Sequence, residues 1–160
     1  MRLNKVLSLS LMTIAGMLAT ACGGDDPESA PSEGQIAEIL GVGQLGSCSI
    51  SSCHGTDTAS AGLDFMNATS LHDLLVDKPS CEAPKFKLVD PGSPETSWLY
   101  LKLTAPADAK RKLEENPDWG EPGTGCEEAS GFGKRMPETG QELSEDKKEQ
   151  IRKWIAAGAP

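Results

Sequence analysis

The segment that most constrains this chain is a pair of cysteines followed by a histidine, Cys48-Ser49-Ile50-Ser51-Ser52-Cys53-His54. Two such thiols can form thioether bonds to the vinyl groups of a haem, and the histidine directly after them then lies under the iron as an axial ligand. The usual attachment signature has two residues between the cysteines, whereas this segment has four. A Cys48–Cys53 disulfide, or a metal site that uses His54 and His72, remains an alternative.

The number of cysteines is odd, which needs an explanation in an exported protein because free thiols are unusual in an oxidising compartment. The chain has five, namely Cys22, Cys48, Cys53, Cys81 and Cys126. If Cys22 carries a lipid and Cys48 and Cys53 bind haem, Cys81 and Cys126 are left to pair with each other. This count predicts a Cys81–Cys126 disulfide, with two separate buried thiols as the alternative.

Export is predicted by residues 1–21, which have the parts of a secretory signal. Arg2 and Lys5 make the N-terminal region positive, residues 6–19 form an apolar run, and small or aliphatic residues precede Cys22. The apolar run is short for a membrane span, which needs about 20 apolar residues. An uncleaved anchor helix is the alternative to a cleaved signal peptide.

The segment Ala19-Thr20-Ala21-Cys22 resembles the lipobox of bacterial lipoproteins, although Ala19 stands where that family usually has a larger aliphatic residue. The resemblance implies cleavage before Cys22, acylation of this residue, and membrane attachment through the lipid. Residues 22–34 are rich in Gly, Pro, Ser and acidic residues, which is typical of a flexible linker. We therefore expect a signal peptide (1–21), a lipid-anchored linker (22–34) and one folded domain (35–160), exported and facing the periplasm or the cell surface.

The acidic composition excludes one class of partner. The full chain has a formal charge of −9, and removal of residues 1–21 takes away Arg2 and Lys5 but no acidic residue, which changes the charge to −11. Nucleic acid is therefore not an expected partner, because its phosphates repel such a surface. The charge either keeps the protein soluble or favours a protein partner with a basic docking face.

Hydrophobic spacing and capping residues predict a mostly α domain with long loops and no sheet. Helices are expected over residues 36–45, 70–76, 93–103 and 144–158, with a polar surface helix over 107–115. Ser93 and Pro94 are a favourable start for the third of these, and Gly158 a favourable end for the last. Residues 87–89 are expected to be extended, residues 61–65 to form a loop or an extended segment, and residues 116–133 to form a loop.

The order of motifs over residues 35–159 resembles the cytochrome c-like domain of bacterial lipoproteins from myxobacteria and their relatives. The matching pieces are Ser52-Cys53-His54-Gly55, Ala61-Gly62-Leu63-Asp64, residues 89–103, Met136-Pro137 and residues 143–159. The chain departs from that pattern in its four-residue cysteine spacing and in a longer charged segment at 105–130. The resemblance implies a helical domain like class I cytochromes c, with long loops wrapped around one covalent haem c.

The same resemblance implies that Met136 is the distal iron ligand. The residues agree, because Met1, Met12 and Met17 lie in the signal and the mature chain keeps Met66 and Met136. Met136 also follows a glycine-rich stretch, which lets the backbone pass close to a porphyrin. Ligation by Met66 or His72, or an open sixth position, are the alternatives.

The function expected from the sequence is electron transfer by one haem with His54 and Met136 as axial ligands. Such a protein is an electron carrier rather than an enzyme; it needs a redox protein partner and no small-molecule substrate. Two alternatives are kept: a haem sensor or enzyme with an open sixth position, and a haem-free, disulfide-stapled binding or structural lipoprotein.

Overall fold

The computed structural model describes residues 29–43, 48–104, 118, 120–126, 132–138 and 141–160, together with Arg111 and Glu115. The predicted signal peptide, Cys22, most of the linker and most of residues 107–115 lie outside the described residues. Within the described ranges the fold is mostly helical, and its β-structure consists of two isolated bridges, Val76 with Val89 and Pro79 with Lys87. The elements in chain order are α1 (Glu33–Leu40), η1 (Ser60–Gly62), α2 (Leu71–Leu75), η2 (Pro94–Thr96), α3 (Trp98–Leu103) and α5 (Glu145–Ala156).

Helix α1 begins earlier and ends earlier than the predicted helix over 36–45. Ser32 caps the helix, and its hydroxyl accepts from the N–H of Gln35, whose side chain bonds back to the Ser32 N–H. This capping box satisfies N–H groups that have no partner inside the helix. At the other end Gly41 adopts a left-handed conformation with φ of 72°, which stops the helix after Leu40.

Helices α2 and α5 lie where the sequence predicts them. The hydroxyls of Ser70 and Ser144 cap their N-termini by accepting from the N–H of Asp73 and of Lys147. In α5 the apolar residues at helical spacing, Ile151, Trp154 and Ile155, are fully buried. Amphipathic spacing and caps, both local signals, were sufficient for these two helices.

The predicted helix over 93–103 is instead two short helices, η2 and α3, separated at Ser97. The first N–H groups of α3 donate outside the helix: Trp98 to the carbonyl of Lys87 at 2.8 Å and Leu99 to that of Leu88 at 2.9 Å. Ser93 makes no side-chain cap. The helix breaks at Ser97 because the N–H groups of Trp98 and Leu99 donate to carbonyls of the segment 87–89. In a continuous helix over 93–103 they would donate to carbonyls inside the helix.

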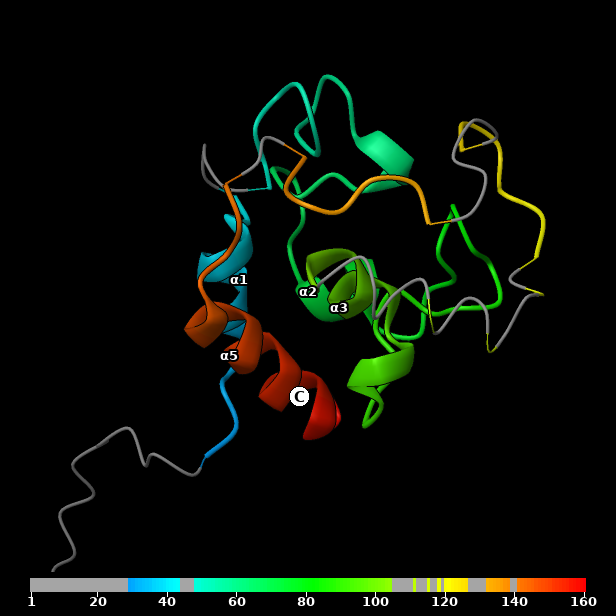
Figure 1. Cartoon of the computed structure of the whole chain (residues 1–160). Helices are drawn as coiled ribbons and strands as arrows, with labels where there is room; N and C mark the ends of the chain where they lie inside the picture. Colours follow the sequence, from blue (N-terminus) through cyan, green and yellow to red (C-terminus); the bar gives the residue numbers. More distant parts are fainter. Residues whose placement is uncertain are drawn as a thin grey trace, which may run out of the picture.

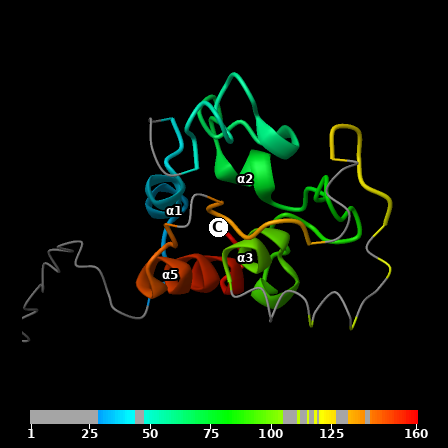
Figure 2. The same cartoon turned by 45° about the horizontal axis from the view of Figure 1, so that its top comes forward.

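The helices pack around a core in which α1, α3 and η2 each contact α5, and α1 contacts α2. Figures 1 and 2 show α1 and α5 side by side, with α3 next to α5 and the segment 48–65 at the far end of the domain. The segment 132–138, orange in Figure 1, runs close to α3. Long loops therefore approach the short helices from one end of the domain, where the candidate site lies.

Among the described residues, no helix is long and apolar enough to cross a membrane.

Candidate functional site

One cavity of about 540 Å³ brings together residues from distant parts of the chain. Six of the residues that the sequence singled out line it: Cys48, Cys53, His54, Cys81, Cys126 and Met136. Its other walls come mainly from segment 60–65, helix α3 and the region of Cys81. The apolar lining residues include Ile50, Leu63, Phe65, Leu75, Leu88, Trp98, Leu99 and Leu103. A cavity of this size and character is typical of a bound cofactor or other small apolar ligand.

The cysteine–histidine segment is folded into a compact turn. The N–H of Cys53 donates to the carbonyl of Ile50 at 2.9 Å, and the N–H of His54 donates to that of Cys48 at 3.2 Å. Gly55 lies inside this turn, where a Cβ would come within 2.8 Å of the Ser49 carbonyl oxygen. Glycine is therefore required here for the turn to close and to present both thiols and the imidazole to the cavity.

The His54 imidazole is held in one orientation. Its Nδ1 lies 2.9 Å from the carbonyl oxygen of Ser60, and its ring meets Phe65 edge-on with 5.6 Å between the ring centroids. Because a carbonyl only accepts, Nδ1 carries the proton and the lone pair of the neutral ring is on Nε2. Burial lowers the pKa of His54, outweighing its hydrogen bonds to backbone carbonyls. The neutral imidazole is the form that binds iron.

Cys48 and Cys53 are half-buried free thiols in the structure. Burial, followed by the neighbouring Cys53, raises the pKa of Cys48 to about 11. Cys48 is therefore a neutral thiol at physiological pH. The pair forms no disulfide here, and the described residues contain no group of three or more His, Cys, Asp or Glu side chains arranged to hold a metal ion.

Met136 reaches the cavity from the segment 132–138. Its N–H donates to the carbonyl oxygen of Lys102 at 2.7 Å, which ties this segment to the end of α3. The two alternative ligands, Met66 and His72, are not among the residues that line the cavity. His72 is exposed on α2, where its N–H donates to the carboxylate of Glu33 at 3.0 Å.

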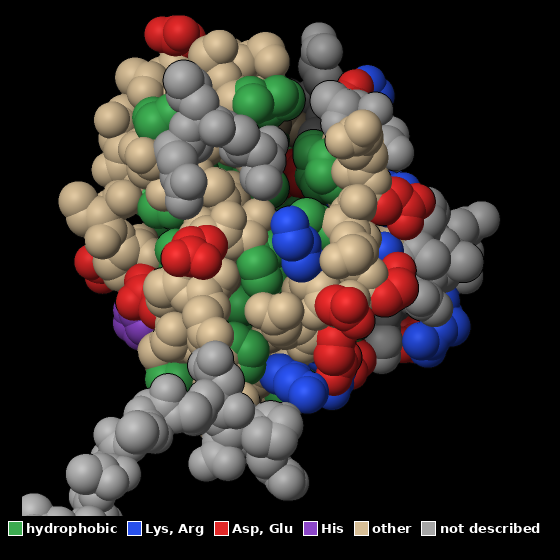
Figure 3. Space-filling model, turned by 90° about the vertical axis from the view of Figure 1, so that its left-hand side faces the viewer, with side chains coloured by type: hydrophobic (Ala, Val, Ile, Leu, Met, Phe, Trp, Pro, Cys, Tyr) green, Lys and Arg blue, Asp and Glu red, His purple; other side chains and the backbone are tan. Residues whose placement is uncertain are grey.

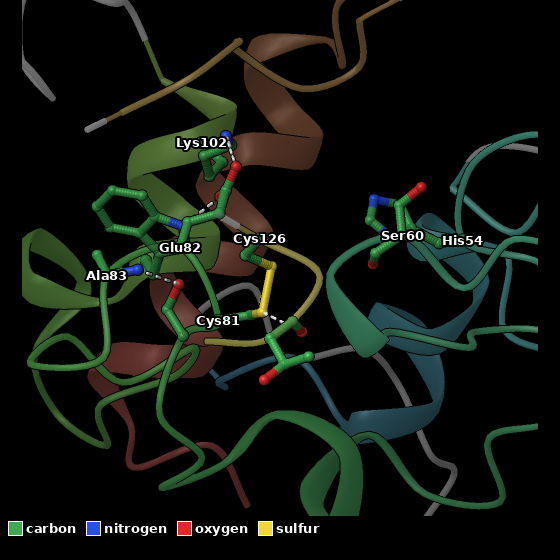
Figure 4. Close-up of a disulfide and its surroundings, with 10 residues drawn as sticks. His54, Ser60, Cys81, Glu82, Ala83, Lys102 and Cys126 are labelled. Carbon is green, nitrogen blue, oxygen red and sulfur yellow. Dashed lines mark hydrogen bonds and ion pairs between the residues drawn. A yellow bond between two sulfur atoms is a disulfide. The ribbon is translucent and has the colours of Figure 1, made fainter. Parts of the chain in front are cut away.

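A disulfide joins Cys81 to Cys126, with 6.0 Å between the Cα atoms and a sequence separation of 45. This is the pair that the cysteine count left over. Both residues line the cavity, and Gly123 donates its N–H to the Cys81 carbonyl at 2.8 Å. The cross-link holds the loop 120–126 against the cavity wall (Figure 4).

Sequence reasoning missed a polar network in the same wall, formed by Glu82, Trp98 and Lys102. The indole Nε1 of Trp98 donates to one carboxylate oxygen of Glu82 at 2.8 Å, and the Lys102 ammonium donates to the other at 3.0 Å. Figure 4 shows this network beside the disulfide, with His54 and Ser60 across from it. The available signal was Lys102 itself, a lysine inside the otherwise apolar run of residues 98–103.

The charged residues next to Met136 pair with nearby acids rather than extending into the cavity. Lys134 forms an ion pair with Glu138, and Arg135 forms one with Glu142. On the face drawn in Figure 3, side chains of both charges are interspersed.

The chain matches no protein-family model, and neither a curated protein nor a solved structure shows significant similarity to it.

Proposed function

We propose that this chain is a c-type cytochrome with a single covalent haem, which carries electrons. One observation carries the proposal: Cys48, Cys53, His54 and Met136, chosen from the sequence, all line the same apolar cavity of about 540 Å³. The order of motifs along the chain, which resembles the cytochrome c-like domains of bacterial lipoproteins, points the same way.

The donor set fits a haem of this class. Two half-buried thiols are suited to form thioether bonds to vinyl groups, and neither is used in a disulfide. His54 supplies a neutral imidazole whose orientation is set by the Ser60 carbonyl, the kind of outer contact that fixes a histidine ligand. The apolar lining suits a porphyrin and limits the access of water.

Haem iron supplies a one-electron couple when bound, and a methionine ligand opposite histidine raises its potential. His54 and Met136 would both hold the iron and would leave no open position for a substrate, which favours an electron carrier over an enzyme or gas sensor. The partner would then be another redox protein, and the acidic composition favours one with a basic docking face.

Covalent haem is tested by expressing the protein with a working c-type cytochrome assembly system. After denaturing electrophoresis, haem staining is expected at the mass of the mature chain. The double variant Cys48→Ala/Cys53→Ala is expected to lose the stain, whereas Met66→Ala, which changes a residue outside the cavity lining, keeps it. Alkylation of both Cys48 and Cys53 in wild-type protein matured in this way would overturn the proposal.

We further propose that the mature chain is held to a bacterial membrane by lipid on Cys22. The support is in the sequence alone, where a signal-like segment ends at a lipobox-like cysteine and a polar linker follows. Mass spectrometry of the N-terminal peptide is expected to show Cys22 as the first residue, with acyl chains attached. An unmodified Cys22, or cleavage elsewhere, would contradict the anchor.

A further inference from the structure

Lys102 is buried in the cavity wall, where a lysine is unusual. Lys102 is only 5% exposed, and its neighbours in α3 are mostly apolar. Removing an ammonium from water costs several kcal/mol unless partners compensate it. Lys102 has two strong ones: Nζ donates to the Glu82 carboxylate at 3.0 Å and to the main-chain carbonyl of Phe132 at 2.9 Å.

The contact with Phe132 is reinforced by its ring. The Lys102 ammonium lies 5.0 Å from the centroid of the Phe132 ring, within the range of a cation–π interaction. The same ammonium lies 5.9 Å from the ring centroid of Trp98. Glu82 accepts in turn from the indole N–H of Trp98, so the carboxylate that pairs with Lys102 is itself held in place.

Lys102 holds the segment before and at Met136 by two separate groups. Its side chain binds the carbonyl of Phe132, and its main-chain carbonyl accepts from the N–H of Met136 at 2.7 Å. Phe132 and Met136 are four positions apart in sequence. A single residue of α3 thereby fixes both the start of the glycine-containing stretch and the residue whose thioether lines the cavity.

We propose that Lys102 is the positioning residue for Met136: it clamps the segment 132–136 so that the thioether is presented at the iron. This inference rests on the proposed function, since it assigns a role in the binding of the distal ligand. The Glu82–Lys102 pair then holds an ammonium against the Phe132 carbonyl, which an apolar residue at position 102 could not do. An apolar side chain would fill the wall equally well, but it would leave the Phe132 carbonyl without its ammonium partner.

The test uses the haem-loaded full-length mature protein and three variants. Lys102→Leu removes the ammonium and adds no second thioether to the cavity that Lys102 lines. Lys102→Leu/Glu82→Gln also removes the carboxylate charge that the first variant leaves largely buried and without its ammonium partner. Lys148→Leu is the matched control, because Lys148 is also buried and paired with carboxylates but does not line the cavity.

Two readouts separate positioning from a general loss of stability. The weak red sulfur-to-iron absorption band reports Met136 ligation, and amide hydrogen exchange at Met136 reports the clamp whether or not haem is bound. Both Lys102 variants are expected to keep covalent haem, lose most of the band and exchange the Met136 amide about tenfold faster or more. Lys148→Leu is expected to change neither readout.

Three outcomes would overturn the inference. Retention of the band and of Met136 amide protection in Lys102→Leu would show that the clamp is not needed. Recovery of both in the double variant would show that the effect came from the Glu82 charge left without its ammonium partner. Equal losses in Lys148→Leu would show a non-specific effect. Wild-type protein without covalent haem would instead overturn the proposed function, which the haem stain reveals before any variant is compared.

Discussion

The N–H of Met136 donates to the carbonyl oxygen of Lys102 at 2.7 Å, which joins a loop near the C-terminal end of the chain to the last turn of α3. This contact brings a thioether into the same cavity wall as the cysteine–histidine segment more than 80 residues earlier. This hydrogen bond involves only main-chain atoms, so the Met136 side chain can be shortened without removing it.

If the proposed haem is bound, Met136→Ala is expected to remove its proposed distal ligand while leaving the fold and the thioether bonds intact. The oxidised protein should lose its red sulfur-to-iron band and bind added ligands such as imidazole, because a coordination position is open. Its reduction potential should fall, because thioether sulfur favours ferrous iron. Absorption spectra and a redox titration measure these changes. Met66→Ala is the control and is expected to leave both properties nearly unchanged; a retained band in Met136→Ala would contradict the ligand assignment.

Gly55→Ala is expected to destabilise the protein by about 2 kcal/mol, in the range of overpacked sites. The added Cβ would lie 2.8 Å from the Ser49 carbonyl oxygen and 2.9 Å from the Ser51 Cα, both of them backbone atoms that cannot turn away. Urea unfolding followed by circular dichroism measures the change.

Gly34→Ala is the matched control for this substitution. Gly34 lies in α1, and the nearest atom to its added Cβ would be the Ser32 hydroxyl oxygen at 3.9 Å. This change is expected to stabilise the protein by about 0.5 kcal/mol through lower chain entropy in the unfolded state. Equal effects of the two substitutions would show that the turn at Gly55 has room for a Cβ.

Removal of the disulfide by Cys81→Ser/Cys126→Ser is expected to lower the free energy of unfolding by about 4 kcal/mol from loop entropy, since the bridge spans 45 residues. Urea unfolding of the double variant against wild type measures this loss. Non-reducing peptide mapping of the wild-type protein is expected to recover the Cys81–Cys126 cross-linked peptide. Detection of a free Cys81 thiol in air-exposed, haem-loaded protein would refute the pairing.

Glu33 makes stability depend on pH in the acid range. Its carboxylate accepts from the His72 N–H and the Ser70 hydroxyl, each at 3.0 Å, and these bonds, the one from His72 first, lower the pKa of Glu33. A lowered folded-state pKa means that the stabilisation is present above the ordinary glutamate pKa and is lost as the pH falls through the folded value.

Glu33→Gln is therefore expected to cost about 1 kcal/mol at neutral pH, after allowance for solvent exposure. The difference from wild type should shrink as the pH falls below the ordinary glutamate range, because the wild-type carboxyl also becomes neutral. Thermal unfolding at a series of pH values measures it. Glu38→Gln, on the exposed side of the same helix, is expected to have little effect, and a pH-independent loss in Glu33→Gln would contradict the assignment.

Local signals in the sequence were enough to locate α2 and α5. Ser70 and Ser144 cap α2 and α5 through bonds to residues three positions later. The cysteine–histidine segment could also be recognised from the sequence, because the two cysteines and the histidine lie within seven consecutive residues. These features depend on interactions within a few residues of sequence, which composition and periodicity report directly.

The tertiary structure alone decided the features that depend on distant partners. The expected helix over 93–103 breaks at Ser97 because Lys87 and Leu88 offer carbonyls to the N–H groups of Trp98 and Leu99. Burial of Lys102 likewise depends on Glu82 and Phe132, which lie 20 and 30 residues away. No local pattern encodes such contacts, since their free energy is gained when remote segments meet and exclude water together. The sequence by itself thus pointed to Cys48, Cys53, His54 and Met136, and tertiary packing determined that they share one cavity and which contacts hold Met136 there.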